Sequence, residues 1–262
     1  MINLSTLSFI RKNYPEIKVT QWFLDKMDDE WEKNKIRFLD KMELMDCSFC
    51  TTSPNAVNLP KYKKNYYIPN PADISFETLK CYENKHPIYD LFFAMSHGVH
   101  RGILKRGKFD KRSLIINQLI KENPDLKFNL HGINTKQPIW ADDFKLSLFK
   151  SKMALNLSQG KATKYYSSDR IAQLIGNGIL TLVDIKTKLS KFFKNDEVIF
   201  YKSIKDLSQK INFYSSNKVI RNKIAKNGKK KYLTLFNSSK IAEYIVDKSM
   251  NYKSNKKYFW DN

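Results

Sequence analysis

From residue 87 onward, hydrophobic positions fall into short apolar runs that alternate with longer amphipathic segments. The runs have the length of buried β-strands, and the segments between them repeat apolar residues at helical spacing. Strands are predicted over residues 88–95, 126–130, 153–157, 179–183 and 198–201. Helices are predicted over 110–121, 141–150, around 171–175, near 187–193 and in two or three later segments. This alternation predicts an α/β fold with a Rossmann-like, doubly wound parallel sheet. In the helix at 110–121 we expect Leu114, Ile115, Leu119 and Ile120 to face inward.

The first sixty or so residues repeat the pattern on a smaller scale. A helix at 4–14 ends at a proline, and a strand at 17–24, a helix at 31–45 and a strand at 46–52 follow. In the helix at 31–45, Ile36, Leu39 and Met42 are expected to share the apolar side. Proline-marked residues 61–73 have the character of an extended connector. These elements are too few to close a doubly wound sheet. We therefore expect residues 1–65 to be a remnant of an N-terminal α/β domain with a linker, and 66–262 to be the main domain.

The stretch at 165–184 combines a polar entry, a short helix and a buried strand. Ser167, Ser168 and Asp169 are residue types that favour the N-cap of a helix. Gly176 and Gly178 are expected to end the helix, because glycine accepts the left-handed backbone of a helix C-terminus. A helix that begins with hydroxyl groups and carries Arg170 is suited to a phosphate group. We therefore predict an anion site at its N-terminus.

Glycine, histidine and basic residues follow the ends of the predicted strands. Gly98, His100, Arg101 and Lys105 come after the strand at 88–95, and His131 and Gly132 close the strand at 126–130. Residues 158–161, with the sequence SQGK, follow the strand at 153–157. Ligands of doubly wound sheets bind beyond the carboxyl ends of the strands. Glycine lets the backbone approach a ligand closely, and arginine and lysine neutralise phosphate oxygens. These loops are therefore predicted to border the ligand site.

Two other motifs in the sequence could indicate a metal site or a disulfide bond. His97 and His100 have a spacing compatible with a metal site, but no third ligand of a matching type lies nearby. Cys47 and Cys50 are three apart on a predicted strand, so their side chains face opposite sides of the sheet and cannot readily share a metal or a disulfide. Neither a Walker-type GxxxxGK[ST] motif nor a GxGxxG motif is present. No metal site is therefore predicted.

The charge is extreme, with 47 basic against 26 acidic residues and a net charge of +21. An anionic partner such as nucleic acid would explain it, but the lysines are scattered over nearly every segment and no nucleic-acid motif is recognised. Three cysteines, no membrane-length apolar run and no signal-peptide pattern favour the cytoplasm. The aromatic tail from Tyr252 to Trp260 fits two alternatives, a contact with the inner face of the membrane or a segment packed on the neighbouring domain.

The order of these elements resembles the C-terminal half of GT-B glycosyltransferases, in the group 1 branch that includes spore-maturation glycosyltransferase-like domains. That branch carries a stretch of the form S-x-R-x-x-E-x-x-x-x-G before an apolar strand. Ser168, Arg170 and Gly178 match it, and Gln173 replaces the glutamate. The likeness covers about residues 66–246, and the earlier residues resemble the last strands of the N-terminal domain of that fold.

The resemblance implies a glycosyltransferase that takes a nucleotide-sugar as co-substrate, without metal or another cofactor, and a glycan, lipid-linked or protein acceptor. It places the diphosphate at two groups of residues: Gly98, His100, Arg101 and Lys105, and Ser167, Ser168, Asp169 and Arg170. It places the base and ribose at His131, Gly132, Ile139 and Gln173, with Tyr165 and Gln173 at the positions of two family glutamates. The acceptor side is largely missing, so no catalytic base is assigned. The alternative is a non-catalytic nucleotide- or polyanion-binding α/β module.

Overall fold

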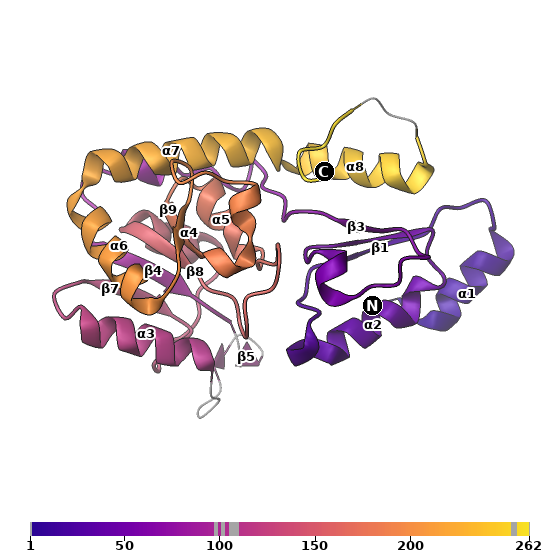
Figure 1. Cartoon of the computed structure of the whole chain (residues 1–262), viewed down its shortest axis with the longest axis horizontal. Coiled ribbons are helices and arrows are strands. Elements are labelled where there is room, and N and C mark those ends of the chain that lie inside the picture. The colour runs from indigo at the N-terminus through magenta and orange to yellow at the C-terminus, as the bar shows by residue number, and fades with distance from the viewer. Residues whose placement is uncertain (1, 97–98, 101–102, 105–109, 253–255, 262) are drawn as a thin grey trace.

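The computed structural model describes residues 2–96, 99–100, 103–104, 110–252 and 256–261, and it contains two parallel sheets. The first sheet has the order β1-β2-β3, formed by β1 (Thr20–Phe23), β2 (Cys47–Cys50) and β3 (Asn65–Tyr67). Helices α1 (Leu4–Asn13) and α2 (Glu32–Met42) lie along one side of it in Figure 1. The β-α-β pattern predicted for this region is confirmed.

The second sheet has five strands in the order β10-β9-β8-β4-β7. Its strands are β4 (Tyr89–Ala94), β7 (Phe128–His131), β8 (Ser151–Asn156), β9 (Leu180–Asp184) and β10 (Ile199–Tyr201), all paired in parallel. The chain runs outward from β4 to β7, then crosses back to β8 on the other side of β4. The order therefore reverses between β4 and β8, which is the switch point where doubly wound folds bind ligands.

Helices cover both faces of this sheet, as a doubly wound fold requires. The helices are α3 (Lys111–Glu122), α4 (Ala141–Phe149), α5 (Arg170–Gly176), α6 (Ile204–Ser216) and α7 (Lys218–Leu235). Alternate residues of β4 face different cores: Leu91 and Phe93 pack with α3 and α6, whereas Phe92 packs with α4 and α5. The period-two alternation of this strand thus holds a helix layer on each side of the sheet.

The last helix, α8 (Ser238–Met250), leaves the second sheet and lies over the first (Figure 1). Tyr244 of α8 packs against Phe49 of β2, and the buried tail residues Tyr258 and Trp260 pack against Tyr244. Of the two alternatives for the aromatic tail, the structure therefore supports the packed segment. In the described part of the chain, no helix is long and apolar enough to cross a bilayer.

Three details differ from the sequence-based predictions. The residues expected to form only a connector include β3, and the expected boundary between residues 65 and 66 falls inside this strand. Ile36 is 49% exposed and Leu114 is 58% exposed, so both predicted inward faces were partly wrong. In α2 the buried positions are Asn34, Phe38 and Met42, and in α3 they are Arg112, Ile116 and Leu119. In each helix the buried face includes a polar residue, so a pattern of apolar residues alone does not indicate correctly which face is buried.

Candidate functional site

Two neighbouring cavities open at the carboxyl ends of β4 and β8, at the switch point of the second sheet. The first has a volume of about 290 Å³ and the second about 320 Å³. Both are bordered by Ser96, which follows β4, and by Asp169 and Arg170 at the start of α5. Ser96, which follows β4, and the start of α5 therefore border a shared hollow.

Arg170 is the cation at the junction of the two cavities. One guanidinium nitrogen, Nη1, donates a hydrogen bond of 3.0 Å to the carbonyl oxygen of Leu157, at the end of β8. The guanidinium carbon lies 5.5 Å from the centre of the Phe93 ring. Burial, together with repulsion from the Arg112 guanidinium, lowers the pKa of Arg170 to about 10. The side chain therefore stays charged at neutral pH, and its poor solvation favours an anionic ligand.

The residues before Arg170 differ in how they relate to the cavities. None of the expected hydroxyl or carboxyl groups caps α5: Asp169 occupies the N-cap position without a capping hydrogen bond. Ser167 is buried, and its hydroxyl forms hydrogen bonds with the side chain of Asn156, away from both cavities. Ser168 borders the second cavity, and its buried Oγ has no hydrogen-bond partner among the described residues. Ser168 is therefore the hydroxyl of this segment that is placed to meet a ligand.

Two backbone amides in the first turn of α5 are already engaged within the helix. The N–H groups of Ile171 and Ala172 donate to the carbonyl oxygens of Ser168 and Asp169, at 3.1 and 3.0 Å. The helix has only seven residues. Because these amides and the dipole of so short a helix offer little to an anion, the positive charge of the site comes mainly from the Arg170 side chain.

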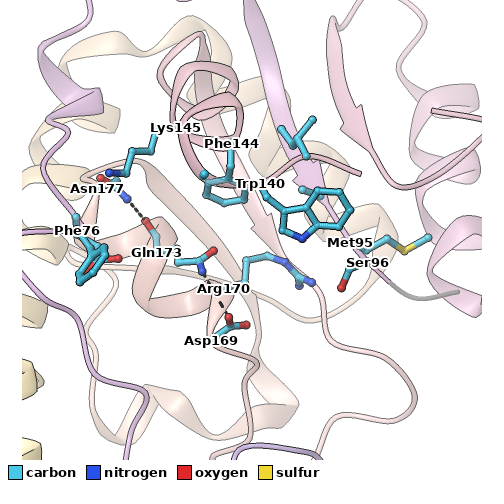
Figure 2. Close-up of a pocket in the computed structure, with 14 residues that line it drawn as sticks. Phe76, Met95, Ser96, Trp140, Phe144, Lys145, Asp169, Arg170, Gln173 and Asn177 are labelled. Carbon is cyan, nitrogen blue, oxygen red and sulfur yellow. Dashed lines mark hydrogen bonds between the residues drawn. The ribbon is translucent and has the colours of Figure 1, made fainter. Parts of the chain in front are cut away.

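The first cavity is lined by Gln173 and Ile139, two of the four residues expected near the base and ribose. Figure 2 shows the Gln173 amide between Arg170 and the end of the cavity that holds Phe76, with the Trp140 indole on the other side of Arg170. The Gln173 side chain donates a 3.4 Å hydrogen bond to Asp169. Residues that the sequence analysis missed complete the wall: Phe76, Glu77, Trp140, Phe144, Lys145 and Asn177.

The other two expected residues, His131 and Gly132, lie behind this cavity rather than in its wall. His131 Nε2 lies 2.9 Å from Asn129 Oδ1 and 2.7 Å from Ser147 Oγ, and burial lowers the pKa of the imidazole. Gly132 has φ +72°, and a Cβ there would lie 1.7 Å from the carbonyl oxygen of Met95. These residues therefore hold the β7 loop close against the end of β4. Tyr165 likewise lies outside both cavities, with its ring centroid 5.2 Å from that of Tyr67.

The second cavity is built from both sheets. The loop after β1 and the start of α2 contribute Asp25, Lys26, Trp31 and Asn34, and the second sheet contributes Arg112, Ser158, Gln159 and Tyr166. Two of its cations are paired with carboxylates. Lys26 Nζ lies 2.6 Å from Asp28, and the Arg112 guanidinium lies 2.7 Å from Asp110, the N-cap residue of α3. Ser158 and Gln159 belong to a loop that the sequence predicted to border the ligand site, whereas the other residues named here were not predicted from the sequence.

Several predicted residues fall in the loop after β4. Gly98, Arg101 and Lys105 lie outside the described residues, as does His97. His100 belongs to β5 (Val99–His100), which pairs with β6 (Ile103–Leu104) in a two-stranded antiparallel ribbon. The predicted contacts of these residues with a diphosphate stay predictions.

The two other motifs are also placed. Cys47 and Cys50 are buried as free thiols in two different hydrophobic clusters, as their spacing predicted. Within the described residues, no three His, Cys, Asp or Glu side chains gather in the manner of a metal site. The expectation of metal-independent chemistry is not tested by this observation.

Comparisons with known proteins place this chain in a family. The model of a family described as glycosyl transferase-like matches residues 111–247. No curated protein matches the sequence.

Among solved structures, S. aureus TarM superposes with a TM-score of 0.64 at 11% identity, over 90% of this chain and 51% of TarM. Anabaena HepE in complex with UDP and glucose gives a TM-score of 0.62 at 9% identity, over 94% of this chain and 75% of HepE. Sucrose-phosphate synthase from Thermosynechococcus elongatus gives a TM-score of 0.60 at 12% identity, over 94% of this chain and 70% of the synthase.

The chain thus spans about half the length of TarM. Identities this low carry information about the fold alone, which is the Rossmann-like fold of GT-B glycosyltransferases. With the family model covering more than half of the residues, the chain belongs to the glycosyl transferase-like family of the GT-B group 1 glycosyltransferases.

Proposed function

We propose that this chain binds a nucleotide-sugar in the first cavity and transfers the sugar to a glycan acceptor held in the second cavity. In this proposal, the second sheet and its helices form the donor-binding side, and the first sheet forms the acceptor side. The reaction uses no metal and no cofactor beyond the nucleotide-sugar. The family and the fold support the class of reaction, and the residues of the two cavities support the roles given below.

The observation that carries the proposal is the position of Arg170 between the two cavities. A sugar leaves its donor with the bonding electrons on the diphosphate, so negative charge grows on the leaving group in the transition state. A fixed cation in a poorly solvated place stabilises that charge more than it would in water. Ser168, whose Oγ has no hydrogen-bond partner among the described residues, is placed to donate a hydrogen bond to the same group.

Gln173 and Trp140 are proposed to hold the nucleoside in the first cavity. An amide accepts hydrogen bonds from ribose hydroxyls through its oxygen and donates through its nitrogen, although without the charge of the glutamate that the family pattern has here. The exposed indole of Trp140 offers a flat face for a base. The side chain of Ile139 adds apolar wall beside it.

The acceptor is proposed to be an uncharged sugar unit of a glycan, free or lipid-linked. Trp31 and Tyr166 give the second cavity aromatic surface, and Asp25 adds a carboxylate that can accept hydrogen bonds from sugar hydroxyls. The positive charges of Lys26 and Arg112 are matched by Asp28 and Asp110. The cavity therefore has less to offer to a second phosphate than to a neutral ring with hydroxyl groups.

Calorimetric titration with UDP and GDP tests this proposal. Replacing Arg170 by methionine removes one charged hydrogen bond to the diphosphate, so binding should weaken by about 1.5–3 kcal/mol, or roughly tenfold to 150-fold. The control is Arg221→Met. Arg221 is also buried, has a lowered pKa because of burial, and donates to backbone carbonyl oxygens of Tyr214 and Ser215, but it borders neither cavity.

Arg221→Met should reduce stability and leave the dissociation constant unchanged. Equal affinities of the wild type and the Arg170→Met variant would refute the site. Tight, steeply salt-dependent binding of RNA without preference for nucleoside diphosphates would instead support the polyanion-binding alternative.

A further inference from the structure

The ammonium group of Lys26 joins the two sheets beneath the second cavity. Lys26 follows β1 and is only 4% exposed. Its Nζ lies 2.6 Å from Asp28 Oδ2 and donates hydrogen bonds to the carbonyl oxygens of Lys161, at 2.5 Å, and Gln159, at 3.2 Å. Residues 159 and 161 belong to the loop after β8, at the carboxyl end of the second sheet. A lysine of the first sheet therefore holds a loop of the second.

The donors of this ammonium group are fully used. A lysine side chain has three N–H donors and no acceptor, and here one carboxylate and two carbonyl oxygens take them. Although Lys26 borders the second cavity, it has no donor left for a ligand. Its role must therefore lie in the position of the loop rather than in direct binding.

Contacts in the opposite direction complete the connection. The backbone N–H of Lys161 donates a 2.7 Å hydrogen bond to Glu30 Oε2, and this bond is the main cause that lowers the pKa of Glu30. The hydroxyl of Thr163 donates a 2.7 Å hydrogen bond to Asp28 Oδ2. The loop is thus held by one cation and two carboxylates from a single short segment, residues 26–30.

Gly160 shows that the loop is shaped for these contacts. It has φ +71°, a conformation that favours glycine. A Cβ at this position would lie 2.1 Å from Glu30 Oε2 and 2.9 Å from Lys26 Nζ. A larger residue would therefore displace the Glu30 carboxylate and the Lys26 ammonium from the loop, either by moving these side chains or by moving the loop.

We propose that Lys26, Asp28 and Glu30 form a latch that fixes the loop at residues 158–161, and that Lys26 is a positioning residue for the acceptor side of the site. The latch sets the wall of the second cavity, where Ser158 and Gln159 lie, whereas the first cavity contains no latch residue. The structural part of the proposal stands by itself. The link to the acceptor rests on the proposed function.

Hydrogen exchange and fluorine NMR test the latch without any ligand. Replacing Lys26 by methionine should raise the exchange rate of the Lys161 amide on the order of tenfold, the change that corresponds to losing one charged hydrogen bond. With 5-fluorotryptophan in the full chain, the Trp31 resonance should shift because this ring borders the second cavity, and the Trp140 resonance should stay in place. Resonances are assigned with Trp31→Phe and Trp140→Phe.

Two further variants keep the test decisive. Gly160→Ala leaves every charge in place and should give the same faster exchange of the Lys161 amide and the same shift of the Trp31 resonance. This variant therefore tests the latch even if Lys26→Met does not fold. Lys33→Met changes an exposed lysine of α2 close to the latch and should give neither change. An unchanged Lys161 exchange rate and an unmoved Trp31 resonance in Gly160→Ala would overturn the latch.

Titration of the same labelled proteins with UDP separates the two proposals. UDP should shift the Trp140 resonance with equal affinity in the wild type, Lys26→Met and Gly160→Ala, which supports a latch that acts on the second cavity alone. If UDP binds none of these proteins, the proposed function fails while the latch is judged by hydrogen exchange. If the UDP affinity of both latch variants falls by the same factor as the protection of the Lys161 amide from exchange, the latch also acts on the first cavity, and its assignment to the acceptor side is wrong.

Discussion

Trp140 offers the clearest separation of ligand binding from folding. The residue occupies the N-cap position of α4 with extended backbone, and its side chain makes no capping hydrogen bond. It is 50% exposed and borders the first cavity, where Figure 2 shows the indole beside Arg170. Truncation to alanine therefore removes only the half of the side-chain surface that is buried. Stacking of a base on an aromatic side chain contributes about 1–3 kcal/mol, so UDP binding should weaken roughly fivefold to 150-fold.

The assay is calorimetric titration of UDP, with urea unfolding of the same samples. Trp22→Ala is the matched control, because Trp22 is 42% exposed on β1 and borders neither cavity. Both variants should lose a similar amount of stability, because the two side chains are exposed to a similar extent, and only Trp140→Ala should lose affinity. If both variants bind UDP as the wild type does, the nucleoside does not lie against Trp140, and the assignment of the first cavity is refuted.

Two further predictions concern the loop behind the first cavity. Gly132→Ala should lower the free energy of unfolding, measured in urea, by at least about 2 kcal/mol, because left-handed backbone is strained for alanine and its Cβ would meet the Met95 carbonyl oxygen. Gly178→Ala should lower this free energy less, because the new Cβ would meet only side chains, those of Tyr82 and Lys229. Equal losses in the two variants would count against this reasoning. Burial lowers the pKa of His131 below its usual 6.5, so the unfolded chain binds a proton at a higher pH than the folded chain does. The free energy of unfolding should therefore fall as the pH drops below 6.5 towards the pKa of the folded protein. The urea midpoint of His131→Gln should depend less on pH over this range, and parallel pH profiles of the variant and the wild type would contradict the lowered pKa of His131.

The fold was predictable because most strands of the second sheet contain a short apolar run, although β7 also carries Asn129 and His131. β8 and β9 are buried along almost their full length, so their runs are visible without any knowledge of neighbours. β3 was missed because it is three residues long and only half-buried, and it is a strand because β2 pairs with it. Ile36 and Leu114 were misplaced because Asn34 and Arg112 take buried positions that an apolar pattern assigns to the surface.

The residues of the candidate site that were predicted from the sequence lie mostly in one local stretch, with Ile139 as an exception. Arg170 and Ser168 stand in a recognisable order before a short helix, and both border the cavities. Ser167 stands in the same stretch, yet its hydroxyl is taken by Asn156 from the preceding strand. Lys26 and Trp140 come from segments far from this stretch in sequence, and no spacing rule connects them to it. Only the folding of both sheets around one hollow brings these residues together.

The central claim is that a nucleoside diphosphate binds across the ends of β4 and β8 with its phosphates at Arg170. A crystal structure of the full chain with UDP tests this most directly. The account predicts a diphosphate oxygen within about 3 Å of the Arg170 guanidinium and the nucleoside in the first cavity, along Gln173 and Trp140. UDP bound elsewhere on the molecule, with Arg170 still facing an empty cavity, would contradict it.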